Sequence, residues 1–498
     1  MFRAWKVRLL ASCGVLAGAV LMSANAWAIT LEQAVSIALD SNPEIGQAIE
    51  NREAIEFELR QARGLYRPRV DLEAFAGPRL LDNPSRRTQG IDDDTLHQKE
   101  IGTTVTWKLF DGFGREAEVE RQASRVDGAS HRVYERSEFI ALAISKEYFE
   151  ILLQQRILGI TEENLAFHNN TLDKIEAGLS GGTYTTADKE QAEERVSAAR
   201  ARITEAKEQL EDARIRFFKL VAQPASSLAH YRNLSGSVPK SLDTAIGMAR
   251  TNNPRVKLAE ADIDAAAALV KAARARYYPE ISLEGRASTG EDVDGVEDRT
   301  EDLQGRVVAK WNLYAGGIDK ANEQEQLRRV AEERLKLNSI LREVEEALRS
   351  AWNNRTKQGE LGYQLAEQAE AGKNVVEAYE EQFKAGKRTL LDVLSAQNTF
   401  FNTEVLRETA RHAEAFAAYR ILASMGGLVP TLGVQVASAA DPYARAQARV
   451  PETPPADTDR RYSPYRGPHP HLDLHTEFSP LWHTEVMPAW DTVVVPAK

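Results

Sequence analysis

The sequence repeats itself in order, and this repeat constrains the fold more than any other feature. The segment from Leu31 to Asn42-Pro43 returns as the segment from Leu242 to Asn253-Pro254, 211 positions later. Two further segments return downstream in the same order: residues 63–72 as 274–283, and residues 107–112 as 311–316. Three matches in one order predict two copies of one unit. We expect the first unit over residues 29–240, the second over residues 241–432 and a tail over residues 433–498.

The first 28 residues have the pattern of a bacterial signal peptide. Three basic residues precede an apolar stretch over residues 9–22, and the small residues Ala26 and Ala28 precede the expected cleavage site. A competing interpretation takes residues 10–13 as a lipobox, but most of the apolar stretch follows Cys13 instead of preceding it. Because Cys13 is the one cysteine of the chain, we expect a mature protein without disulfides or thiolate metal sites.

Charge and motifs exclude several classes of function. Removal of Arg3, Lys6 and Arg8 with the leader lowers the count of basic residues from 63 to 60, against 74 acidic residues. An acidic chain without a basic stripe is a poor binder of nucleic acid. The sequence has no zinc-protease motif, phosphate-binding loop or dinucleotide fingerprint. We therefore expect no enzyme, no cofactor, no metal and no nucleic-acid partner.

Each unit predicts the same series of elements. A helix begins near Leu31 or Leu242 and ends before Pro68 or Pro279, because proline lacks the amide donor and disfavours helix in the preceding residue. Apolar and polar residues then alternate, which is typical of strands with one apolar face. We expect these strands over residues 69–77, 101–110, 280–288 and 304–314, with polar loops over residues 77–100 and 290–302.

Long helical hairpins follow the strands. The helix expected from Gly114 to Ala177 would be about 95 Å long at 1.5 Å per residue. Apolar residues at seven-residue steps along it predict antiparallel coiled-coil packing. We expect the helix to return over residues 187–220, and the second hairpin to occupy residues 316–384 and 390–425.

Two interpretations of the strands remain open from the pattern alone, a small soluble sheet or part of a transmembrane β-barrel. A bilayer tolerates no open sheet edge, and four strands cannot close a barrel. If the strands span a membrane, three chains would supply twelve. Aromatic residues near the strand ends would then lie at the membrane interface: Tyr66, Trp107, Tyr278, Trp311 and Tyr314.

The chain resembles the TolC family of outer-membrane channel proteins. The resemblance rests on Asn-Pro early in each unit, Tyr-x-Pro before a strand, Leu109-Phe-Asp-Gly112 after one, and residues 385–397 at the second turn. It covers residues 30–429 and implies a mainly α fold with a homotrimeric barrel of twelve strands and a periplasmic helical tunnel. It also implies a periplasmic adaptor and an inner-membrane ABC transporter or proton-driven pump as partners, with the outer membrane of a Gram-negative bacterium as the location.

Charged and aromatic residues at the hairpin turns are the candidate site. Asp188 and Asp392 occupy matching places at the start of returning helices, where acids favour the positive helix end. The resemblance implies a sharper role, in which Asp188 and Arg388 belong to a network that closes the periplasmic aperture and Asp392 forms an acidic ring. Phe383 stands where a hydrogen-bonding tyrosine is common, which would remove one latch, and Ser395 would leave the acidic ring single.

The expected function is conduction through an exit duct. A comparison of Gly178 with Gly386 suggests a first turn about four residues longer than the second, from an insertion over Gly178–Thr183. A glycine-rich turn of this kind resembles the type I secretion branch that exports large adhesins, although it would also fit a tolerated loop insertion. We therefore expect type I protein secretion, with multidrug efflux as the alternative. An alternative of another class is a secreted coiled-coil scaffold or adhesin.

The tail differs in composition from the rest of the chain. It is rich in proline and contains His469, His471, His475 and His483, which could hold a metal loosely. We expect the tail over residues 433–498 to be disordered.

Overall fold

The computed structural model describes residues 28–293 and 298–454. The expected signal peptide, except its last residue, and the four histidines of the tail lie outside the described residues. Among the described residues, no helix combines the length and the apolar character needed to cross a membrane.

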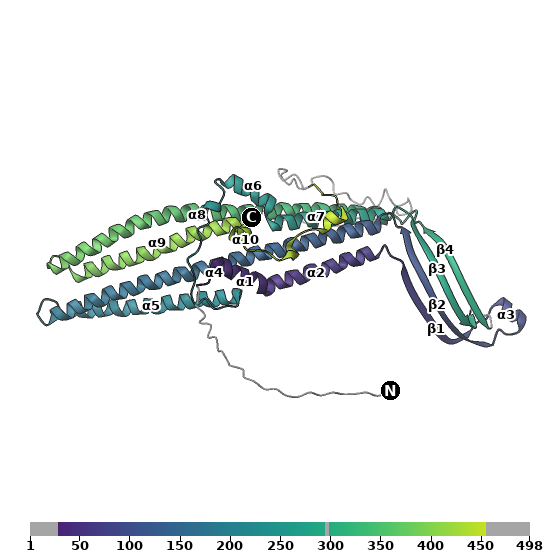
Figure 1. Cartoon of the computed structure of the whole chain (residues 1–498), viewed down its shortest axis with the longest axis horizontal. Helices are drawn as coiled ribbons and strands as arrows, with labels where there is room; N and C mark the ends of the chain where they lie inside the picture. Colours follow the sequence, from purple (N-terminus) through teal and green to yellow (C-terminus); the bar gives the residue numbers. More distant parts are fainter. Residues whose placement is uncertain (1–27, 294–297, 455–498) are drawn as a thin grey trace, which may run out of the picture. The chain divides into compact units, whose positions relative to one another are not determined.

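The described chain contains two similar series of elements (Figure 1). The first series comprises α1 (Leu31–Ser41), α2 (Pro43–Gly64), β1 (Arg69–Leu80), α3 (Pro84–Gln89), β2 (Thr95–Phe110), α4 (Gly114–Leu179) and α5 (Thr186–Val221). The second comprises α6 (Leu242–Asn252), α7 (Pro254–Ala275), β3 (Glu280–Glu291), β4 (Arg299–Lys310), α8 (Ile318–Lys384) and α9 (Leu390–Ser424). Two short helices, α10 (Leu428–Leu432) and α11 (Ala444–Ala448), follow.

The first helix of each series is broken in two, whereas the sequence predicted one continuous helix. The break falls at Asn-Pro, because the proline takes the first position of the new helix and the asparagine caps it. The side-chain oxygen of Asn42 accepts from the Glu44 amide at 2.9 Å, and its Nδ2 donates to the Leu220 carbonyl at 3.2 Å. Asn253 makes the matching bonds to Arg255 and Ser424. Each Asn-Pro therefore joins the break to the C-terminal part of its own hairpin.

The four strands form one antiparallel sheet in the order β1-β2-β3-β4. Its register aligns the apolar residues on one face, since Val70 pairs with Val105 and Leu283 with both Trp107 and Val307. This face is exposed on the single chain, and Leu303 is 87% accessible. The fourth strand was expected to include Trp311 and Leu313, but β4 ends at Lys310.

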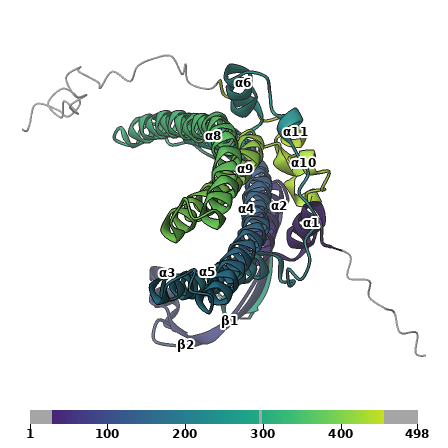
Figure 2. The same ribbon diagram turned by 90° about the vertical axis from the view of Figure 1, so that its left-hand side faces the viewer.

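The long hairpins pack side by side. Helix α5 lies on α4, α4 on α9, and α9 on α8, as Figure 2 shows. The core where they meet α1 and α7 contains two fully buried tyrosines. The hydroxyl of Tyr148 donates to the carbonyls of Ile29 and Ala229, and that of Tyr419 to the carbonyl of Arg232. These bonds satisfy polar groups in an otherwise apolar interior.

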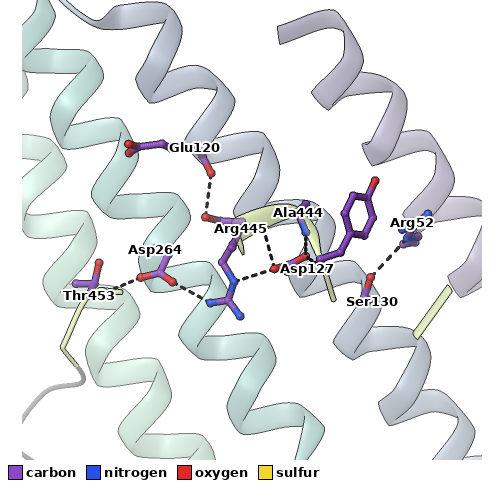
Figure 3. A network of polar contacts seen from close by, with 10 residues as sticks. Arg52, Glu120, Asp127, Ser130, Asp264, Ala444, Arg445 and Thr453 are labelled. Atoms are coloured by element: carbon purple, nitrogen blue, oxygen red, sulfur yellow. Dashed lines mark hydrogen bonds and ion pairs between the residues drawn. The ribbon is translucent and has the colours of Figure 1, made fainter. Parts of the chain in front are cut away.

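Residues 433–454 are ordered, which corrects the expectation of disorder for this part of the tail. The Arg445 guanidinium lies between Asp127 of α4 and Asp264 of α7, at 3.1 and 2.8 Å (Figure 3). Asp127 also accepts from the amides of Tyr443 and Ala444, and Asp264 from that of Thr453. Two buried carboxylates therefore fasten the segment to both repeats. Residues 455–498 lie outside the described part of the chain.

Candidate functional site

The turns of the two hairpins have the same length and share two backbone hydrogen bonds. The Gly182 amide donates to Leu179 and the Gly386 amide to Phe383, and both glycines have positive φ angles, of 74° and 70°. The next amides, of Thr183 and Lys387, donate back to Gly178 and Gln382. All these positions are related by a shift of 204 residues, so Gly182 matches Gly386 and Gly178 lies within α4. The expected four-residue insertion is wrong.

Asp188 and Asp392 complete matching capping boxes. The Asp188 carboxylate accepts from the backbone amide and the hydroxyl of Thr185, at 2.9 and 2.8 Å. Asp392 accepts from the same two groups of Thr389, at 3.2 and 2.8 Å. Hydrogen bonds from the Thr389 side chain and backbone lower the pKa of Asp392. Both acids thus stabilise the starts of their helices.

Arg388 lies within its own hairpin. Its Nε donates to the Gln382 side chain at 3.0 Å, its guanidinium lies 4.2 Å from the Tyr379 ring centroid, and Asp392 is 3.9 Å away. Within the described part of the chain no ion pair joins Arg388 to Asp188. A bond between these two residues in one subunit is therefore not part of this conformation.

Phe383 contacts Tyr184, which is not among the site residues predicted from the sequence. Its ring stacks on that of Tyr184 from the other hairpin, with centroids 5.3 Å apart and planes at 13°. A cluster of buried apolar residues from both hairpins lies beside the rings: Ile175, Ala192, Leu390 and Leu394. The correct alignment of the turns would have drawn attention to Tyr184, because it occupies the place that Arg388 has in the second turn.

Aromatic residues surround the junctions between the sheet and the helices. The indole of Trp107 donates to the Tyr66 carbonyl at 3.0 Å, and that of Trp311 makes the matching bond to Tyr277 at 3.1 Å. Trp311 keeps this contact although it lies beyond β4. Tyr278 packs edge-on against Phe110 and Phe113.

The exposure of these aromatic side chains is high. Tyr66, Trp107 and Tyr278 are 45%, 41% and 52% accessible, and Trp311 and Tyr314 are 60% and 80% accessible. The Arg115 guanidinium lies over the Tyr66 ring at 4.7 Å. Tryptophan and tyrosine with an exposed ring and a satisfied polar atom are typical of membrane–water interfaces.

A four-stranded sheet with an exposed apolar face, joined to long paired helices, defines the subunit of an outer-membrane channel. The chain belongs to the outer membrane efflux protein family, whose model matches residues 34–223 and 245–427. It is 24% identical to the outer membrane efflux protein BepC of Brucella suis over 88% of this chain and 94% of that protein. It is 26% identical to the toluene efflux pump outer membrane protein TtgI of Pseudomonas putida, over 75% and 80% of the two chains.

Solved structures have the same fold. The outer membrane protein VceC of Vibrio cholerae superposes with a TM-score of 0.68 at 16% identity, over 80% of this chain and 96% of that one. CusC, whose structures concern folding and transmembrane channel formation, superposes with a TM-score of 0.70 at 17% identity, over 80% and 92%.

Family membership confirms the main expectations from the sequence. The protein is a TolC-like outer-membrane component with a periplasmic helical tunnel and a trimeric barrel. Proteins of this family work in tripartite systems with periplasmic adaptors and inner-membrane pumps. They are channels and not enzymes.

Proposed function

We propose that the protein is the outer-membrane duct of an efflux system for small organic molecules. The observation that carries this proposal is the similarity to an outer membrane efflux protein along 88% of the chain. The relatives with toluene or solvent efflux in their names add support for the cargo. A polar duct spares such molecules from crossing the outer membrane, and the energy comes from the inner-membrane pump.

Type I protein secretion is the competing cargo assignment. It rested on a longer first turn, and the two turns have the same length. No other feature of the described residues favours protein cargo over small molecules. A secreted scaffold or adhesin fits poorly with membership in a family of outer-membrane channels.

The test is deletion of the gene in its own host, followed by two assays on the same cultures. We expect faster accumulation of a fluorescent dye and lower tolerance of organic solvent, with an unchanged set of secreted proteins. Complementation with the wild-type chain should restore both properties. Normal dye accumulation together with the loss of a large secreted protein would instead establish type I secretion.

The same proposal assigns roles to parts of the chain. Residues 1–28 are the signal peptide, residues 29–240 and 241–432 are the two repeats, and the interface aromatics anchor the barrel in lipid. Three copies of Asp392 near the trimer axis would attract cations and repel anions. Asp188 and Arg388 contribute to the closed aperture through contacts between subunits. Replacement of either by alanine should raise the closed-state conductance, and unchanged conductance in both variants would contradict this role.

A further inference from the structure

Tyr184 and Arg388 occupy equivalent places but hold their hairpins in different ways. Arg388 bonds to Gln382 of its own hairpin. The position that matches Gln382 in the first hairpin is Gly178, against which the Tyr184 ring lies. A Cβ added to Gly178 would come within 2.4 Å of the Tyr184 ring. The glycine therefore makes room for the ring to lie flat over the end of α4 and to reach the second hairpin.

The Tyr184 ring of the first hairpin contacts the second hairpin. It stacks on Phe383 with centroids 5.3 Å apart, and the buried cluster that lies beside the rings takes Ile175 and Ala192 from one hairpin and Leu390 and Leu394 from the other. Stacked aromatic pairs over an apolar cluster contribute more than the buried area alone. The two hairpins of one subunit are thus joined at their turns by apolar packing.

Polar contacts between the hairpins are weaker near this end. Lys174 and Glu380 form an ion pair at 3.4 Å, and both side chains are accessible to solvent. Exposed pairs of this kind contribute little and are screened by salt. Farther from the turns, the buried side chain of Gln397 donates to Asn164 at 2.9 Å. The aromatic stack is therefore the strongest contact at the turns themselves.

We propose that Tyr184 and Phe383, seated by Gly178, form an apolar latch that holds the periplasmic aperture closed. This inference rests on the proposed channel function. Opening requires the two hairpins of a subunit to separate at their turns, which breaks the stack and exposes the cluster beside it. Phe383 stands where a hydrogen-bonding tyrosine is common, so an apolar contact takes the place of a hydrogen bond at this position. Because apolar packing is not screened by ions, the latch keeps its strength at high salt.

The test measures closed-state conductance of purified channels in planar bilayers. Tyr184→Ala and Phe383→Ala should each raise conductance several-fold, and the double variant should match the single ones because the two rings act as one unit. Gly178→Ala should also raise it, since the added Cβ displaces the Tyr184 ring. Tyr184→Phe keeps the stack and should behave as wild type. Tyr363→Ala is the matched control, an exposed aromatic residue of α8 whose hydroxyl bonds to Glu367 of the same helix.

A crosslink between the same two positions tests in cells whether the hairpins must separate there for the channel to open. The mature chain has no cysteine, so a variant with Tyr184→Cys and Phe383→Cys carries one defined pair. A short bis-methanethiosulfonate crosslinker should stop dye efflux through this variant, and a reductant should restore it. Each single cysteine variant serves as a control.

The results of these experiments distinguish a failure of the proposed latch from a failure of the proposed channel function. If the wild type forms closed channels but the alanine variants conduct no more than it does, the latch is wrong and the channel function stands. Normal efflux through the crosslinked pair would also overturn the latch. If the wild type forms no channel at all, the proposed function itself fails.

Discussion

The Asp264 carboxylate accepts a 2.8 Å hydrogen bond from the Arg445 guanidinium and so binds the C-terminal segment to α7 of the second repeat. The same guanidinium reaches Asp127 on α4 of the first repeat. Both aspartates are almost fully buried, since Asp127 is 3% exposed and Asp264 is 5% exposed. One arginine, 181 residues from Asp264 and 318 from Asp127, therefore neutralises two buried charges and joins the two repeats.

Replacement of Arg445 should be strongly destabilising. Arg445→Ala leaves two buried carboxylates without their counter-charge, and removal of one partner from a buried ion pair costs about 3–5 kcal/mol. We expect a lower thermal midpoint for the purified protein and rapid proteolysis within residues 441–454. Arg449→Gln is the control, because Arg449 is an exposed arginine of the same segment. Equal proteolysis of both variants and the wild type would show that Arg445 does not hold the segment.

Glu138 should make stability depend on pH. It is buried and accepts from the amides of Leu428 and Val429, both at 3.1 Å, and burial raises its pKa to about 7. Because this value lies above that of an unfolded glutamate, the native state holds the proton more tightly. Protonated Glu138 therefore stabilises the folded protein fully below pH 4.5. This stabilisation of about 3 kcal/mol is lost as pH rises through 7.

The measurement is the thermal midpoint of the purified protein between pH 5 and pH 8. The wild type should lose stability as pH rises, and Glu138→Gln, which has no proton to release, should show a flatter profile. Parallel profiles for the two proteins would show that Glu138 does not titrate in this range.

Gly112 and Gly316 are equivalent in the repeat but should tolerate substitution differently. Both have positive φ angles, of 66° and 63°. A Cβ on Gly112 would lie 2.4 Å from the Ala275 carbonyl oxygen, whereas one on Gly316 would meet nothing within 4 Å. Gly316→Ala should therefore lower the free energy of unfolding only by the cost of a left-handed backbone at a residue with a Cβ, about 1–2 kcal/mol. Gly112→Ala should move the start of α4 and reduce the amount of assembled protein in membrane fractions. Equal yields for both variants would contradict the close approach at Gly112.

Trp107 and Trp311 should lie at the membrane interface. In vesicles with lipids brominated near the headgroup, fluorescence from these two residues should be quenched. Trp107→Phe and Trp311→Phe should each remove part of the quenched signal. Trp352→Phe should not, because Trp352 packs against the helical core. Quenching that is unchanged in the first two variants would place these residues away from lipid.

The repeat and the sheet could be predicted from the sequence because their signals are local. Alternation along each strand identifies the apolar face, and Val70 and Val105 do pair on it. The sequence predicts one continuous helix through each Asn-Pro, whereas the asparagine caps a new helix and the proline takes its first position. The alignment of the turns failed because Gly178 was matched by residue type, whereas the hydrogen bonds match Gly182 to Gly386.

The contacts of single side chains could not be predicted. Arg445 gave no signal in the sequence because its partners are distant along the chain and lie on different repeats. The Tyr184–Phe383 stack depends on how two hairpins meet, which neither hairpin encodes alone. Local patterns thus indicate elements and faces, while contacts between hairpins require the assembled fold.

One chain supplies too few strands to close a barrel, so three chains must combine. Native mass spectrometry of the detergent-purified protein tests this assembly most directly. We predict particles that contain three copies of the mature chain and release single chains only on harsh activation. A population that consists of monomers under the same gentle conditions would contradict the account.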